Sequence, residues 1–200
     1  MTQVNRVRAD IFRKAFYEQW KQDIESNKDE IYRKFSTDSE WTQFIQPKGG
    51  FLNRVMDRLP IKLEYRTEYY TIDSLYVAGK DLLEKENLCY PSEIHALIEH
   101  ENKDKIEEEM WKLAYLRSPL KVIIFYDYND KEKESSGMKR GWLNNKLSSL
   151  MKMLKLINDF YKENEDTEYL FIIGARREPG GEIYWRWATN DQIQPTVFID

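Results

Sequence analysis

The sequence predicts an α/β protein with a mixed central sheet flanked by helices. Its 200 residues are 41% hydrophobic and 14% aromatic with only 8 Gly and 6 Pro, which suffices for a core and excludes a fibrous or disordered chain. Stretches with helical spacing of apolar residues alternate with short β-rich stretches. We expect a single domain with three parts: helical residues 1–60, a sheet core over 61–128, and a helix with C-terminal strands over 140–200.

Helices are predicted for most of the first part. From Val4 to Glu25 apolar side chains recur at three- and four-residue spacing, which places them on one face of a long helix. Lys28–Phe35 and Phe51–Leu59 have similar spacing, and Pro60 ends the second of these segments.

Three strands are predicted next, because apolar and polar residues alternate and Tyr, Thr, Ile and Val are frequent. We expect the first two strands to turn near Arg66–Glu68 and to end at Gly79. A charged connection over Lys80–Asn87 follows. The segment Ile94–Asn102 begins as an apolar strand and finishes in charge, so its C-terminal tip is expected to reach solvent or a site.

The middle of the chain predicts a helix and then the clearest strand. Asp104 is the expected N-cap of the helix, whose apolar spacing runs to Arg117 until Pro119 stops it. The strand is Leu120–Tyr128. The charged, Ser- and Gly-containing segment Asn129–Arg140 is interpreted as a mobile loop.

A long helix and a hairpin complete the predicted fold. Leucine and methionine recur at helical spacing over Leu143–Phe160. Two strands, Glu168–Ala175 and Ile183–Thr189, are joined by a Gly-rich turn and are expected to pair. On the second strand Trp185 and Trp187 are expected on one side, with Tyr184 and Arg186 on the other.

Composition excludes several classes of function. The longest apolar runs are strand-sized and the N-terminal residues are charged, so we expect a cytoplasmic protein with no membrane partner. One cysteine, Cys89, and two histidines, His95 and His100, exclude an intramolecular disulfide and Cys- or His-rich metal sites. The net charge of −4 is unlike a nonspecific nucleic-acid coat, and no glycine motif of P-loop or dinucleotide type occurs.

Three acidic residues are the most informative feature. Glu99 and Glu101 alternate onto one side of their predicted strand, and Asp73 lies inside a neighbouring strand between apolar residues. Carboxylates held together in a partly dehydrated place repel each other unless a divalent cation or a proton offsets the repulsion. Oxygen ligands of this kind favour Mg²⁺, and hydrolysis of phosphodiesters uses such an arrangement.

These residues resemble the PD-(D/E)XK nuclease superfamily, whose core is ordered helix, three strands, helix, strand. The resemblance covers roughly Ile61–Tyr128, which would form a restriction-endonuclease-like core. Asp73 would be the aspartate of the second core strand, and Glu99-His100-Glu101 would be the (D/E)-X-K element with glutamate in place of lysine. The family's lysine can move to the following helix, where Lys112 is the candidate.

The chain departs from the family pattern at two points. Thr71-Ile72 stands where the family has a proline before the aspartate. The acidic residue of the family's first helix has no unambiguous match, and Glu30 is the candidate for it.

The resemblance implies a metal-dependent endonuclease, with double-stranded DNA as substrate in a restriction or defence setting. Asp73, Glu99 and the carbonyl of His100 would hold Mg²⁺ or Mn²⁺. Glu101 would orient or deprotonate the attacking water, and Lys112 would balance charge on the phosphorus. The His100 ring itself is expected to pack or to form hydrogen bonds. Family members commonly act as dimers, which makes a homodimer one implied assembly.

Two other functions stay open. The chain could be a noncatalytic interaction or accessory protein that keeps the nuclease-like fold, with the glutamates at a solvated strand end. It could also bind a small molecule without metal, for which a large apolar pocket remote from Asp73 would be evidence.

Overall fold

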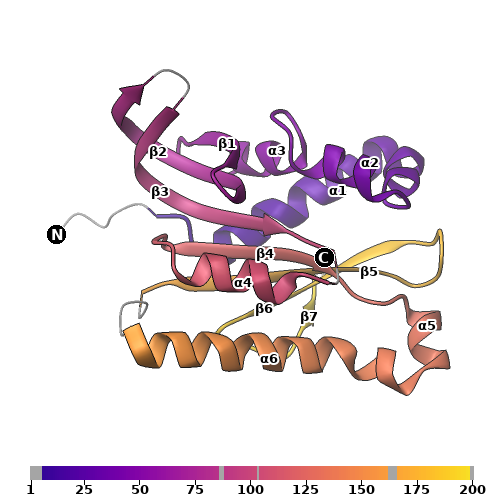
Figure 1. The fold of residues 1–200 in the computed structure, drawn as a ribbon. Helices are drawn as coiled ribbons and strands as arrows, with labels where there is room; N and C mark the ends of the chain where they lie inside the picture. The colour runs from indigo at the N-terminus through magenta and orange to yellow at the C-terminus, as the bar shows by residue number, and fades with distance from the viewer. Residues whose placement is uncertain (1–5, 86–87, 103, 162–165, 199–200) are drawn as a thin grey trace.

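The computed structural model describes residues 6–85, 88–102, 104–161 and 166–198. Within these ranges six helices and one seven-stranded sheet form, which confirms the predicted α/β class with helices flanking a mixed sheet (Figure 1). No helix in the described ranges is long and apolar enough to cross a membrane.

The strands lie in the sheet in the order in which they occur along the chain. The first three strands are antiparallel, β3 to β5 are parallel, and the last three are antiparallel again. Their bounds are β1 Glu64–Tyr69, β2 Ile72–Lys85, β3 Leu88–His100, β4 Leu120–Tyr126, β5 Glu168–Arg176, β6 Ile183–Thr189 and β7 Thr196–Val197.

Helices cover both faces of the sheet because each face carries apolar residues that must leave water (Figure 1). The N-terminal helices α1 Ala9–Lys34, α2 Asp38–Ile45 and α3 Phe51–Asp57 share a core with one face, in which Phe16 packs edge-on against Trp185. The crossover helices α4 Ile106–Ala114 and α6 Gly137–Tyr161 share a second core with the other face.

The first predicted helical segments are joined into one element. α1 continues from Ala9 to Lys34, and Asn27 alone departs from helical geometry, with φ −157° and ψ 50°, at a kink between the two predicted stretches. Helix α2, which was not predicted separately, follows directly and buries Trp41 and Ile45.

The predicted turn between the first two strands and the predicted end of the second strand were both wrong. The turn lies at Tyr70-Thr71 rather than at Arg66–Glu68, and strand β2 continues to Lys85 through the expected charged connection. Charge does not prevent backbone pairing there: the Arg66 guanidinium lies 3.0 Å from the Asp81 carboxylate, so opposite charges stabilise neighbouring strands. Residues 86–87 of that segment lie outside the described ranges.

The predicted mobile loop at Asn129–Arg140 was also wrong. Helix α5 spans Asp130–Ser135, and α6 already begins at Gly137. A capping box starts α5: the Asn129 side chain accepts from the Glu132 amide at 2.9 Å, and the Glu132 carboxylate accepts from the Asn129 amide at 3.1 Å. The high charge of the segment had indicated a loop, whereas the Asn129–Glu132 capping box is the local signal for a helix.

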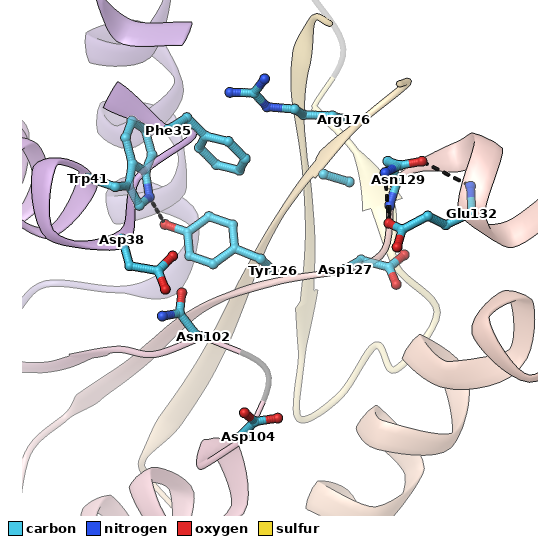
Figure 2. Close-up of a pocket in the computed structure, with 11 residues that line it drawn as sticks. Phe35, Asp38, Trp41, Asn102, Asp104, Tyr126, Asp127, Asn129, Glu132 and Arg176 are labelled. Carbon is cyan, nitrogen blue, oxygen red and sulfur yellow. Dashed lines mark hydrogen bonds between the residues drawn. The ribbon is translucent and has the colours of Figure 1, made fainter. Parts of the chain in front are cut away.

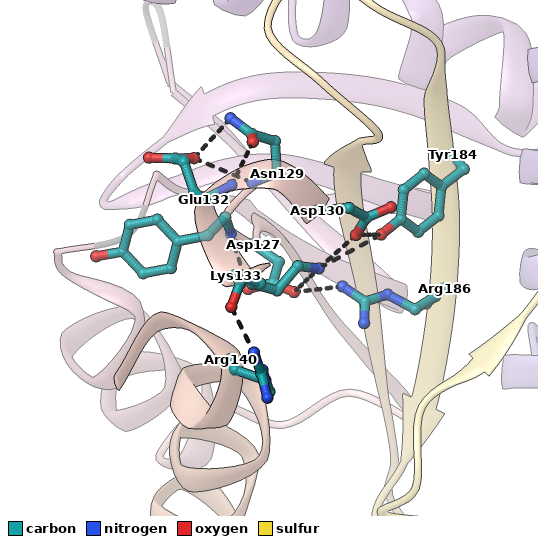
Figure 3. A network of polar contacts seen from close by, with 9 residues as sticks. Asp127, Asn129, Asp130, Glu132, Lys133, Arg140, Tyr184 and Arg186 are labelled. Carbon is teal, nitrogen blue, oxygen red and sulfur yellow. Dashed lines mark hydrogen bonds and ion pairs between the residues drawn. The ribbon is translucent and has the colours of Figure 1, made fainter. Parts of the chain in front are cut away.

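A buried polar network fastens α5 to the sheet (Figure 3). The Asp127 carboxylate, whose side chain is 1% exposed, accepts from Arg186 at 2.6 Å and from Lys133 at 3.1 Å. Tyr184 donates to Asp130 at 2.7 Å. Tyr184 and Arg186 thus face this network while Trp185 and Trp187 pack toward the α1 side, which confirms the predicted alternation.

Lys121 is a buried base in the second core. Its ammonium lies 3.1 Å from the Tyr169 hydroxyl and 3.5 Å from the Ala114 carbonyl, and the residue is fully buried. Desolvation lowers the pKa of Lys121 to about 8 from 10.5. Between these two pH values the unfolded chain binds more protons than the folded chain, so this lysine makes stability rise with pH there.

We expect Lys121→Met with Tyr169→Phe to raise the free energy of unfolding by roughly 2 kcal/mol at pH 7, because both buried polar partners are removed together. The advantage over wild type should shrink as the pH rises from about 8 to 10.5. Tyr169→Phe alone should destabilise the protein, since it removes an acceptor from a buried ammonium. Urea unfolding at several pH values measures the stability of wild type, the double variant and Tyr169→Phe. If the double variant exceeds wild type in stability by an amount that does not vary with pH, a charged Lys121 is contradicted.

Candidate active site

Strand pairing brings Asp73 and Glu99 together. The pair Leu75 and Leu97 belongs to the core under α4 and α6, and continuing this register by two residues places Asp73 opposite Glu99 on the same face. The His100 amide donates to Asp73 Oδ2 at 2.8 Å, and the Asp73 amide lies 3.4 Å from Glu99 Oε2. Each of the two carboxyl groups influences the pKa of the other. The predicted convergence of these two residues is therefore present.

The surroundings penalise charge on both acids. Glu99 is 1% exposed and Asp73 is half-buried. Burial, followed by the charges of Asp73 and Glu109, raises the pKa of Glu99 to about 9, against the opposing effect of Lys112. Burial is also the main cause that raises the pKa of Asp73. Two carboxyl groups in this position need a proton or a cation between them.

Lys112 reaches this pair from α4. Its ammonium lies 3.2 Å from Glu99 Oε1 and donates to the Thr71 carbonyl at 3.0 Å. The helix that carries it begins after Lys105, which takes the N-cap position with no side-chain cap, so the predicted capping role of Asp104 was wrong. Lys112, the predicted candidate for the family's lysine, nevertheless lies beside Asp73 and Glu99.

Glu109 is a fourth acidic residue that was not predicted from the sequence. It is 8% exposed, forms an ion pair with Lys112, and its charge raises the pKa values of Asp73, Glu99 and Glu101. The available signal was its position three residues before Lys112, on a helix whose buried side carries Ile106, Met110 and Leu113.

Glu101 lies at the margin of the cluster, just beyond the end of β3. Its amide donates to the Ile124 carbonyl at 2.9 Å, and its carboxylate accepts from the Asn102 amide at 2.8 Å. Burial raises the pKa of Glu101, and the charges of Glu109 and Asp73 add to the effect. Its side chain is partly open to solvent, in contrast to Glu99.

The His100 ring lies on the opposite face of the sheet. Trp41 donates to the Tyr126 oxygen, so the Tyr126 hydroxyl is free to donate to His100 Nε2, which lies 2.6 Å away. Desolvation lowers the pKa of His100 to about 4, which keeps the ring neutral. The ring packs and forms hydrogen bonds as expected, and only the backbone of His100 faces the acidic pair.

The first-helix candidate, Glu30, belongs to a different environment. It lies on the C-terminal half of α1, where its carboxylate is 2.7 Å from the Lys34 ammonium. The side chains of Lys34 and Glu30 are 30% and 44% exposed, typical of a surface ion pair.

The carboxyl oxygens of Asp73 and Glu99 suit a cation such as Mg²⁺ that takes few ligands from the protein. In the described part of the chain no group of three or more Asp, Glu, His or Cys side chains is arranged around a metal position. Mg²⁺, however, commonly takes one or two carboxylates and completes its shell with water and substrate oxygens. The apposed Asp73 and Glu99 carboxyl groups, whose mutual repulsion a cation would relieve, meet that requirement.

A cavity of about 370 Å³ opens at the carboxyl ends of β3, β4 and β5 (Figure 2). Asn102, which follows Glu101, lies on one side of it with Asp38 and Asp104, and Asp127 and Glu132 lie on the other. Ligands commonly bind outside the carboxyl ends of strands in open α/β sheets. Its lining combines these charged residues with Phe35, Trp41 and Tyr126, so it is not a purely apolar pocket.

A larger hollow of about 930 Å³ lies toward the opposite strand ends. Its lining is more apolar than polar, with Ile94 and Pro119 beside the charged or polar residues Glu93, His95, Arg117 and Asp166. The third hypothesis from the sequence, a metal-free small-molecule binder, therefore stays a prediction.

The chain matches no protein-family model, no curated protein and no solved structure, so the assignment of a function depends on the geometry of the acidic cluster.

Proposed function

We propose that this chain is a metal-dependent nuclease that hydrolyses phosphodiester bonds in nucleic acid. The observation that carries the proposal is the meeting of Asp73 and Glu99 on adjacent strands with the Lys112 ammonium 3.2 Å from Glu99 Oε1. An aspartate, a glutamate and a lysine held together at strand ends are the groups that the PD-(D/E)XK resemblance requires. The element order α1, β1, β2, β3, α4, β4 is compatible with that family's core.

Asp73 and Glu99 are the residues that would hold Mg²⁺ or Mn²⁺, with the carbonyl of His100 as a further ligand. The bound cation supplies charge that polarises the scissile phosphate and lowers the pKa of a water molecule. The His100 amide keeps the Asp73 carboxylate in place through its 2.8 Å hydrogen bond. The two strands therefore orient both acids before any substrate arrives.

Glu101 and Lys112 would carry the proton and the positive charge of the reaction. Glu101 accepts a proton from the attacking water, a role favoured by its raised pKa and its partial exposure. Lys112 offsets negative charge that accumulates on the phosphate oxygens. Its ammonium is held by the Thr71 carbonyl as well as by Glu99, so it is ordered beside the acids in advance.

The proposed substrate is double-stranded DNA in a restriction or other defence setting, and the proposed compartment is the cytoplasm. A homodimer would allow both strands to be cut. These finer assignments follow from the resemblance alone. The second candidate, a noncatalytic accessory protein with the same fold, shares the structure and differs in having no cleavage activity.

A cleavage assay of the full chain tests the proposal. Supercoiled, linear and single-stranded DNA and RNA are incubated with Mg²⁺, Mn²⁺ or Ca²⁺, with EDTA as the control. We expect strand scission with Mg²⁺ or Mn²⁺ that EDTA abolishes. Absence of cleavage on every substrate with every cation would contradict the nuclease and favour the accessory protein.

A further inference from the structure

We propose that Glu109 is a positioning residue that keeps Lys112 in the site when a cation takes over the charge of Glu99. This inference rests on the proposed function. Glu109 is not one of the residues that the resemblance assigns. Its carboxylate and that of Glu99 contact the same ammonium group.

Lys112 forms one hydrogen bond and two ion pairs, and its three partners come from three elements. Glu99 on β3 lies 3.2 Å away, the Thr71 carbonyl in the β1–β2 turn lies 3.0 Å away, and Glu109 on α4 forms the third contact. Two of these three partners are carboxyl groups. The ammonium is therefore shared between the proposed cation site and its own helix.

A divalent cation at Glu99 would repel this ammonium, because both positive charges would compete for one carboxylate. The neutral Thr71 carbonyl is then too weak an anchor by itself. Glu109 supplies the remaining negative charge, and it cannot follow Lys112 outward because it lies on the buried side of α4 next to Met110. Without Glu109, Lys112 would be displaced toward solvent, where its side chain is already 24% exposed.

Glu108 provides a matched control. It precedes Glu109 on the same helix and has the same side chain, but it is exposed to solvent. Glu108→Gln therefore changes the net charge by the same amount as Glu109→Gln, and among the described residues the ion pairs of Lys112 are with Glu99 and Glu109.

The first test needs no cleavage activity. In the full chain, with and without saturating Mg²⁺, the Lys112 ammonium protons are observed by ¹H–¹⁵N NMR of lysine side chains at low temperature and are assigned by their loss in Lys112→Met. Without the cation we expect the resonance in wild type, Glu109→Gln and Glu108→Gln, because Glu99 and the Thr71 carbonyl still hold the ammonium group. With Mg²⁺ the resonance should persist in wild type and Glu108→Gln and disappear in Glu109→Gln. A resonance that persists in Glu109→Gln with Mg²⁺ would overturn the inference.

The second test is a double-mutant cycle on kcat at saturating Mg²⁺. Glu109→Gln and Lys112→Met should each lower kcat by about 10- to 100-fold, and the double variant should be no slower than Lys112→Met alone, because Glu109 acts through Lys112. If the double variant instead loses kcat by the product of the two single losses, the inference is overturned. A wild-type chain that does not cleave would instead overturn the proposed function, while the NMR result would still decide whether Glu109 holds Lys112.

Discussion

Asp73→Asn is expected to reduce Mg²⁺-dependent cleavage by at least about 100-fold without weakening the fold. The substitution keeps the shape of the side chain and removes one of two carboxylates that would hold the cation. Because the two acids repel each other in a buried place, the loss of one charge should leave the free energy of unfolding in cation-free buffer equal to that of wild type or higher. Initial cleavage rates and urea unfolding of the same preparations measure both effects.

Glu99→Gln should behave in the same way, since Glu99 is the more deeply buried member of the pair. Glu93→Gln is the matched control on the same strand, because its carboxylate is 59% exposed and lies away from Asp73. We expect Glu93→Gln to cleave at the wild-type rate. Full activity in Asp73→Asn or in Glu99→Gln would remove that residue from the catalytic site.

Asp127→Asn is expected to destabilise the protein by about 3 kcal/mol. The Asp127 carboxylate neutralises Arg186 at 2.6 Å and Lys133 at 3.1 Å, and the side chains of these two cations are only 16% and 15% exposed. An amide in place of the carboxylate leaves two partly buried positive charges without that partner. Chemical denaturation at neutral pH measures the loss.

Asp130→Asn serves as the comparison in the same network. Asp130 lies 2.9 Å from Lys133 with a side chain that is 36% exposed, so its ion pair is screened by water and we expect a loss below about 1 kcal/mol. Arg186→Met added to Asp127→Asn should recover part of the stability, because it removes one unpaired cation. Equal effects of the two aspartate substitutions would contradict the assigned burial.

The candidate site could be predicted largely because it depends on strand alternation. Period-two alternation placed Glu99 and His100 on opposite faces, and an aspartate between apolar residues marked Asp73. What alternation cannot supply is the register of two strands. The convergence of Asp73 and Glu99 depends on the turn at Tyr70-Thr71, which the sequence analysis placed several residues too early.

Other features were missed because tertiary contacts or local hydrogen bonds decide them. Glu109 looks like one of three surface glutamates in a row, and only the packing of α4 against the sheet shows which of them is buried. The capping box of Asn129 and Glu132 was present in the sequence, but the high charge of the segment was interpreted as solvation. Charge density is thus a poor guide to local order when caps and ion pairs can form.

Calorimetric titration of the full chain with Mn²⁺, without nucleic acid, tests the central claim most directly. The wild-type protein and Glu93→Gln should bind the cation with the same affinity, whereas Asp73→Asn and Glu99→Gln should lose that binding. A wild-type chain that binds no cation, or variants that bind it as tightly as wild type, would contradict a cation site between β2 and β3.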